Sequence, residues 1–169
     1  MSALDDLLLA RRLNGIAFGM CKDEVVGAIG QPEDRLLQKS PEVLKYGSLE
    51  LGFIRPVRNV SSRLATISLY FGRGDKLPDW LDPVEWPISE ITTIDQFRKY
   101  LEAIGLRVHS SATAEPNEYL ITETGVRASF VNGQLRLIHA ADVSQAPIDR
   151  AAKSTALEAS AKHDDVRET

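Results

Sequence analysis

A short pattern occurs twice along this chain and constrains its fold more than any other feature. Each copy begins with a segment ending in Ala-Ile-Gly, at 28–30 and at 103–105, and continues into extended segments rich in leucine and isoleucine. Leu49–Phe53 then corresponds to Val126–Phe130, and Leu64–Ile67 to Leu135–Ile138. The matches are 75, 77 and 71 positions apart (28 to 103, 49 to 126 and 64 to 135). Unequal offsets indicate loops of unequal length, so we expect a duplicated unit.

Three segments carry the signals of helices. Ser2 is a helix-capping residue type, and we expect the helix that it starts to end at Gly15. A second helix is expected from Lys22 to Ile29, because acidic residues occupy its first turn and Gly30 follows its end. The third helix is expected at 93–105, where a capping-box pattern precedes apolar residues at helical spacing.

Extended segments follow each of the last two helices. In several of them apolar and polar residues alternate, which is the period of a strand with one buried face. The expected strands are 35–38, 43–46, 49–54 and 64–71 in the first half, and 106–110, 119–122, 126–131 and 134–140 in the second. Asn132-Gly133 joins the final pair and is the strongest short hairpin signal in the chain.

A segment rich in proline and tryptophan separates the two halves. Prolines at 78, 83 and 87 exclude a helix or a central strand there. We therefore divide the chain into a first helix-sheet unit (1–72), a Pro/Trp linker (73–91), a second unit (92–143) and a tail expected to be flexible (144–169). The expected fold class is α+β, with two tandem helix-plus-antiparallel-sheet repeats and the helices on one sheet face.

Composition limits the classes of function. The formal net charge is −4, which disfavours nucleic-acid binding because neutralising phosphates requires a basic stripe. Cys21 is the only cysteine, so no internal disulfide can form. No segment approaches the ~20 apolar residues that span a bilayer. Asp5 and Asp6 stand where an export signal would be basic, and we expect a cytoplasmic protein.

The segment GMCKDEVVGAIGQP at 19–32 resembles the Gly-x-Ser-x-x-Glu-Val-x-x-x-Leu-Gly-x-Pro opening of the beta-lactamase-inhibitor-protein-like fold, which small outer-membrane assembly lipoproteins share. The resemblance covers 16–71 well and 94–140 loosely. It implies a helix-loop-helix followed by an antiparallel sheet, a unit that occurs in tandem in the inhibitor family. The family's paired cysteines and export signal are missing here. Tyr46–Leu51 with Ile67–Phe71 is also similar to small bacterial proteins encoded among toxin immunity genes.

Few residues have the pattern of a chemical site. Cys21 is expected at a helix N-terminus, where a thiolate is favoured, but no histidine lies nearby in sequence to act as its base. His109 and His139 fall on expected strands, and they would need Asp142 to complete a metal site. Their spacing matches no metal-binding motif. We therefore expect no catalytic residue, no cofactor and no metal.

The expected sheet has a face that the helices do not cover. If the alternation holds, the covered face buries Leu49, Leu51, Phe53, Ile67, Leu69 and Phe71, and then Val126, Ala128, Phe130, Leu135 and Leu137. The opposite face displays Glu50, Thr66, Ser68, Tyr70, Arg127, Ser129 and Arg136. Tyrosine and arginine are common in interface hot spots. Trp80 and Trp86 in the linker either hold the halves together or serve as partner anchors.

These observations favour a non-catalytic protein-binding module, with Glu50, Thr66, Ser68, Tyr70, Trp80, Trp86, Arg127 and Arg136 as partner-binding residues. Its sharpest form is a bacterial immunity-type inhibitor that neutralises a toxin by occlusion, with the acidic residues complementing a basic toxin domain. One alternative is an enzyme or small-ligand-binding protein with a pocket between the halves, using His109, His139 and Asp142. Another is an accessory protein of a secretion or envelope assembly.

Overall fold

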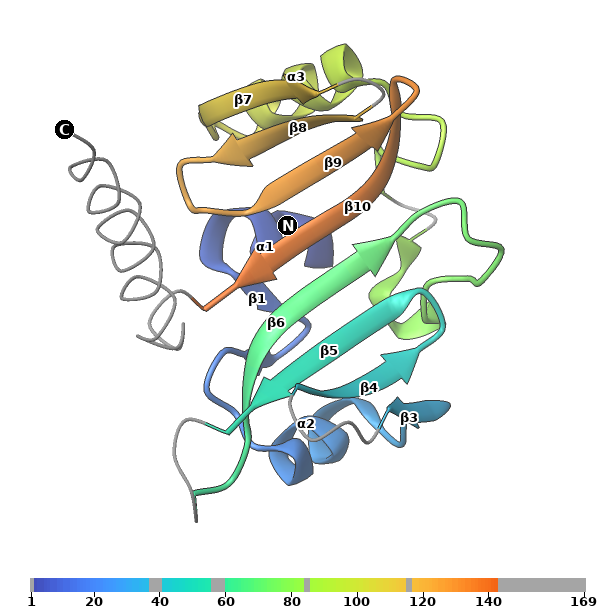
Figure 1. Ribbon diagram of the computed structural model, residues 1–169, viewed down its shortest axis with the longest axis vertical. Helices are drawn as coiled ribbons and strands as arrows, with labels where there is room; N and C mark the ends of the chain where they lie inside the picture. Colours follow the sequence, from blue (N-terminus) through green and yellow to red (C-terminus); the bar gives the residue numbers. More distant parts are fainter. Residues whose placement is uncertain (1, 37–40, 56–59, 84–85, 115–116, 143–169) are drawn as a thin grey trace, which may run out of the picture.

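One antiparallel sheet dominates the computed structural model of the chain (Figure 1). The structure describes residues 2–36, 41–55, 60–83, 86–114 and 117–142, so the expected tail lies outside the described residues. The sheet has eight strands in the order β3-β4-β5-β6-β10-β9-β8-β7. The strands are β3 (Asp34–Leu36), β4 (Glu42–Tyr46), β5 (Leu49–Ile54), β6 (Arg63–Tyr70), β7 (Val108–Ala114), β8 (Asn117–Thr122), β9 (Arg127–Val131) and β10 (Gln134–Ala141).

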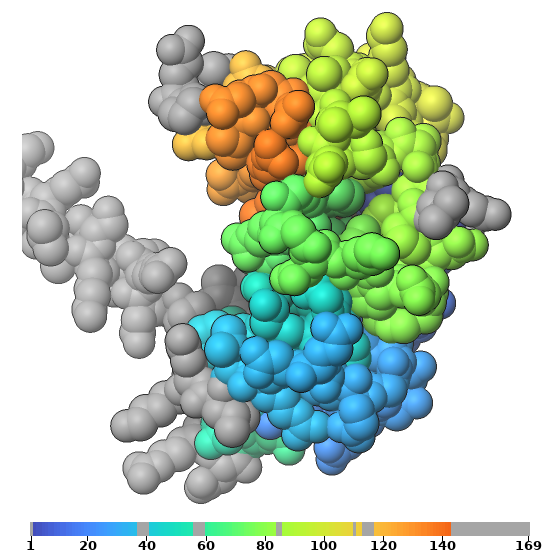
Figure 2. Space-filling model, turned by 90° about the vertical axis from the view of Figure 1, so that its right-hand side faces the viewer, coloured from blue at the N-terminus to red at the C-terminus, as the bar shows by residue number. Residues whose placement is uncertain are grey.

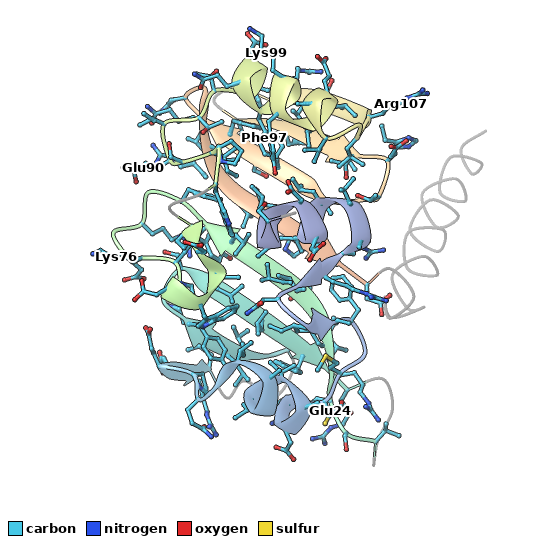
Figure 3. The ribbon with its side chains drawn as sticks, turned by 180° about the vertical axis from the view of Figure 1, so that it is seen from behind. Glu24, Lys76, Glu90, Phe97, Lys99 and Arg107 are labelled. Atoms are coloured by element: carbon cyan, nitrogen blue, oxygen red, sulfur yellow. The ribbon has the colours of Figure 1, made fainter. Side chains whose placement is uncertain are left out.

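The three α-helices of the described residues lie on one side of this sheet, behind it in Figure 1 and in front of it in Figure 3. They are α1 (Ala3–Ala10), α2 (Lys22–Ile29) and α3 (Ile94–Ala103), and a short 3-10 helix, η1 (Asp79–Leu81), lies in the linker. The sequence predicted α2 with its observed bounds. The helix-plus-antiparallel-sheet class, α+β, is confirmed. No helix of the described residues is long and apolar enough to cross a membrane.

The first helix is shorter than the sequence indicated. It ends at Ala10 instead of Gly15, because Arg11 adopts the left-handed conformation (φ 57°) and its N–H donates to carbonyls of the preceding turn. A small hairpin follows, formed by β1 (Arg12–Leu13) and β2 (Ile16–Ala17). Gly15, with φ of 83°, lies in the turn of that hairpin and not at the helix end.

Helices α2 and α3 are each followed by four consecutive strands, and the two sets meet in the middle of the sheet. β6 and β10, the last strand of each set, pair in antiparallel fashion with Ser68 opposite His139. From either edge of the sheet inward, the strands therefore follow each other in chain order, β3 to β6 from one edge and β7 to β10 from the other. The irregularities match as well. Ala65 is the unpaired residue of a bulge against β5, and Arg136, 71 positions later, is the unpaired residue of a bulge against β9.

The core lies between the helices and the covered face of the sheet. Phe97 of α3 is fully buried and contacts Phe130 of β9 edge to face, with 5.9 Å between ring centroids. Leu49, Leu51, Phe53, Ile67 and Leu69 are all buried, as the alternation predicted. The prediction for Leu137 was wrong. The bulge at Arg136 shifts the register by one residue, so Ile138 enters the core and Leu137 pairs with Tyr70 on the opposite face.

Candidate functional site

The face of the sheet opposite the helices, here called the open face, is not covered by any described helix (Figure 1). The strand pairings place the following side chains on it: Val43, Lys45, Glu50, Thr66, Ser68, Tyr70, Leu137, His139, Arg127, Ser129, Tyr119 and Ile121. Antiparallel sheets tolerate one solvated face. Here most of these side chains are half-buried by their own neighbours.

A polar row crosses the middle of the open face. Lys45, Glu50, Ser68, His139 and Arg127 are successive cross-strand neighbours on β4, β5, β6, β10 and β9. Ser68 is 7% exposed, and its Oγ lies 2.9 Å from Nδ1 of His139. Burial, and then the charge of Arg127, lowers the pKa of His139. The imidazole is therefore neutral at pH 7.

This serine and histidine do not have the surroundings of a nucleophilic site. In such sites a carboxylate orients the histidine and stabilises its charged form. His139 instead pairs across the strands with Arg127, a cation, which opposes protonation of the ring. The Ser68 hydroxyl is also buried. The pair is therefore best explained as a structural hydrogen bond at the junction of β6 and β10.

Two tyrosine–arginine pairs adjoin the polar row, with Tyr70 and Tyr119 in the next cross-strand row on the same side. The guanidinium of Arg73 lies 3.6 Å from the ring centroid of Tyr70, and Arg127 lies 4.3 Å from that of Tyr119. Arg73 also makes an ion pair with Glu50 at 3.8 Å. Burial, reinforced by the nearby Glu50 carboxylate, raises the pKa of the Tyr70 hydroxyl, which stays protonated at neutral pH. Each half of the sheet thus presents one aromatic ring held by a cation.

The remaining candidate residues occupy different places. Thr66 is half-buried, with its Oγ1 against Gly52 on the neighbouring strand. Arg136 lies in the bulge of β10, where its Nη2 donates to Oε1 of Gln134 at 2.9 Å. Trp80 is half-buried and makes an edge-to-face contact with Tyr46, with centroids 6.3 Å apart. Trp86 is only 7% exposed and packs into the core, so this tryptophan attaches the linker to the body of the protein.

A cavity of about 440 Å³ lies where β6 runs into the linker. This side of the molecule faces the viewer in Figure 2, with the linker in green to yellow-green across its middle. The lining residues are Tyr70, Phe71, Gly72, Asp75, Lys76, Leu77, Asp79, Pro83, Trp86, Ile88, Ser89 and Glu90. Tyr70 belongs to both the open face and the cavity, so the two surfaces adjoin.

The histidines and the cysteine that the sequence analysis considered as chemical sites do not lie together in the fold. His109 lies on edge strand β7, and β8 and β9 separate it from His139 on β10. Within the described ranges, no group of three or more histidine, cysteine, aspartate or glutamate side chains is placed to hold a metal ion. Cys21 caps α2, and its N–H donates to Oε2 of Glu24 at 2.7 Å.

Sequence reasoning missed the cavity and the Ser68–His139 hydrogen bond. The cavity depends on how the linker folds back against β6, and no local pattern encodes that. The offset of 71 aligns Ser68 with His139 in the sequence, but it does not predict that β6 and β10 pair. Comparison of the chain with protein-family models, with curated proteins and with solved structures gives no match in any of the three.

Proposed function

We propose that this protein is a non-catalytic protein-binding module that docks through its open face. The observation that carries the proposal is the pair of cation-held tyrosines, Tyr70 with Arg73 and Tyr119 with Arg127, on a helix-free surface. Tyrosine and arginine supply large, rigid contact area with polar ends, and they are enriched in interface hot spots. The eight paired strands behind them limit what must be ordered on binding.

We further propose that the two halves are tandem repeats of one helix-plus-four-strand unit. The bulges at Ala65 and Arg136 support this, and so do the capping boxes at the starts of α2 and α3. Isolated bridges give further support, since Cys21 pairs with Arg63 and Thr93 pairs with Gln134. The two tyrosine–arginine pairs are not equivalent in this repeat, because Tyr70 lies on the fourth strand of its unit, β6, and Tyr119 on the second strand of its unit, β8.

In its narrowest form, the proposal is a bacterial immunity-type inhibitor that acts in the cytoplasm and neutralises a toxin by occlusion. The supporting features are the net charge of −4 and the acidic residues around the linker cavity, which would complement a basic toxin domain. The neutral, arginine-flanked His139 and the absence of a metal-holding group among the described residues weigh against the catalytic alternative.

Differential capture tests the proposal. The full chain is immobilised on a resin and incubated with an extract of its native organism. The proteins retained by the wild type are compared with those retained by Arg127→Ala and by Arg107→Ala. Arg107 is exposed and is seen on the helix side in Figure 3, so it is a matched control. A partner that binds the open face should still be retained by the Arg107→Ala control. Arg127→Ala should weaken its binding by about 2 kcal/mol, which is roughly 30-fold in the dissociation constant.

The affinity of each purified pair is then measured by calorimetry, after thermal melts have established that both variants fold. A partner that binds wild type, Arg127→Ala and Tyr119→Ala equally well would place the interface elsewhere and overturn the proposal. A toxin encoded in a neighbouring gene, whose activity falls on stoichiometric addition of this protein, would support the narrower form.

A further inference from the structure

The half of the open face formed by β8, β9 and β10 carries a cation without a counter-charge. None of the residues that the strand pairings of these three fully described strands place there has a carboxylate, and Arg127 is the one cation among them. Arg127 is exposed and makes no ion pair within the part of the chain that the structure describes. In the other half, Glu50 is already paired with Arg73. The surface around Arg127 is therefore positively charged.

A neutral donor lies beside Arg127 on the neighbouring strand. His139 is its cross-strand partner on β10, and Nδ1 of the ring lies 2.9 Å from Oγ of Ser68. The Ser68 hydroxyl is buried, and a buried hydroxyl needs an acceptor for its proton. Nδ1 is the acceptor that the described residues offer, so the hydroxyl donates to it. A neutral imidazole that accepts at Nδ1 carries its own proton on Nε2.

Nε2 of His139 is accessible to a ligand. Among the described residues, the buried side-chain nitrogen and oxygen atoms without a hydrogen-bond partner are Arg11 Nε and Trp86 Nε1. Nε2 of the half-buried His139 has no partner there either, yet it is not one of these buried atoms, so solvent reaches it. The open face thus presents a free N–H donor next to an unpaired guanidinium.

The charge of Arg127 determines which acceptor suits this donor. After burial, that charge is the second cause of the lowered pKa of His139. A cation that opposes a proton on the ring attracts an anion to the same place. The ring of Tyr119, 4.3 Å from the guanidinium carbon, holds Arg127 on this face. A carboxylate matches a single cation, whereas a phosphate group carries a charge of about −1.5 to −2 at pH 7.

We propose that this half of the open face binds an aspartate or glutamate side chain of the protein partner, an inference that rests on the proposed function. The Nε2–H group of His139 donates to the carboxylate, and the guanidinium of Arg127 supplies the opposite charge. Ser68 is a positioning residue, because its hydroxyl fixes the tautomer of His139. The carboxylates around the linker cavity lie on a different surface, so an acidic contact here is compatible with a partner that is basic elsewhere.

The probe for this site is N-acetyl-L-aspartate amide, with N-acetyl-L-asparagine amide as its neutral isostere and inorganic phosphate as a competing anion. Each is titrated into the full chain at constant ionic strength and about pH 7.5, where His139 is neutral. Long-range ¹H–¹⁵N spectra should show a proton on Nε2 of His139 and none on Nδ1. The aspartate derivative should shift the backbone N–H cross-peaks of β9 and β10 saturably, with a dissociation constant on the order of 10 mM.

Substitutions separate the roles of the two side chains, after thermal melts have established that each variant folds. His139→Gln keeps an amide N–H near the position of Nε2 and should retain binding. His139→Asn keeps a polar group only near Nδ1 and should lose the response. Arg127→Gln should weaken binding about two- to fivefold, as loss of an exposed ion pair does. The matched control is Arg107→Gln, which removes an exposed cation on the helix side and should leave binding unchanged.

Equal responses to the aspartate and asparagine derivatives, or no saturable response to the former, would overturn the inference. So would tighter binding of phosphate, a proton on Nδ1 of the free protein, or equal binding by His139→Gln and His139→Asn. The proposed function is judged separately. If capture of a partner depends on Arg127 while the aspartate derivative does not bind, the open face remains the interface and only the carboxylate loses its role. If neither result is obtained, the proposed function fails as well.

Discussion

Replacing Gly47 by alanine tests how the linker is held against the sheet. Gly47 lies in the turn between β4 and β5 with φ of 56°, and a Cβ built there would lie 2.0 Å from the main-chain oxygen of Lys76. That oxygen accepts a hydrogen bond from the Ser48 N–H at 2.9 Å. The Ser48 hydroxyl donates to the Asp75 carbonyl as well. The linker therefore cannot move away from an added methyl group without breaking these hydrogen bonds.

The expected loss has two parts. An L-residue in the left-handed region costs about 1–2 kcal/mol. Forcing a methyl group into close-packed backbone adds about 1–3 kcal/mol. Gly47→Ala should therefore lower the free energy of unfolding by about 2–5 kcal/mol. Gly125, in the turn between β8 and β9, is the matched control, because its φ is 83° and nothing lies within 4 Å of its Cβ. Gly125→Ala should lose only about 1–2 kcal/mol.

Urea unfolding followed by far-UV circular dichroism measures both losses from the transition midpoints and slopes. Equal destabilisation by the two substitutions would refute the reasoning. It would mean that residues 75–76 do not pack against the β4–β5 turn in solution.

The remaining predictions concern single side chains. Because its pKa is lowered from 6.5, His139 should make the protein less stable as the pH falls below about 6.5, where the unfolded chain binds the proton more readily. His139→Asn should abolish this dependence of the unfolding free energy on pH, measured by urea unfolding at several pH values. His109→Asn should retain it. Tyr100→Phe removes the hydrogen bond to Asp5 that joins α3 to α1, and thermal melts should register a loss of about 1–2 kcal/mol. An unchanged melting temperature would contradict that role. Cys21→Ser supplies a better cap and should stabilise by about 0.5–1 kcal/mol, so a destabilised variant would exclude this account of the α2 terminus.

Local signals were sufficient for most of the fold. The acidic first turn and the Gly30 stop define α2, and Asn132-Gly133 forms the turn between β9 and β10 as predicted. The alternation in β6 also assigned its two faces correctly, since Ile67 and Leu69 are buried while Tyr70 faces the other side. Such features depend on residues that are neighbours in sequence, so periodicity and capping identify them.

Features that depend on distant residues were not accessible in the same way. Leu135 and Leu137 read as one alternating run, but the bulge at Arg136 arises from pairing with β9 and reverses the side of every residue after it. The sequence could not decide whether Trp86 holds the halves together or contacts a partner, because the burial of its side chain depends on the path of the linker. The open face was predicted as a set of residues, yet the stacking of Arg73 on Tyr70 was not.

The pairing of β6 with β10 bears on how the proposed tandem repeat could have arisen. A precursor with one helix-plus-four-strand unit would have left its last strand with an unpaired backbone edge. Two copies of such a precursor would close that edge by pairing with each other about a twofold axis. In the present chain that axis would pass between Ser68 and His139, positions that a symmetric ancestor would have filled with one residue type. If the proposed repeat arose by fusion of two such copies, these two positions then diverged into the serine and the histidine that share a hydrogen bond.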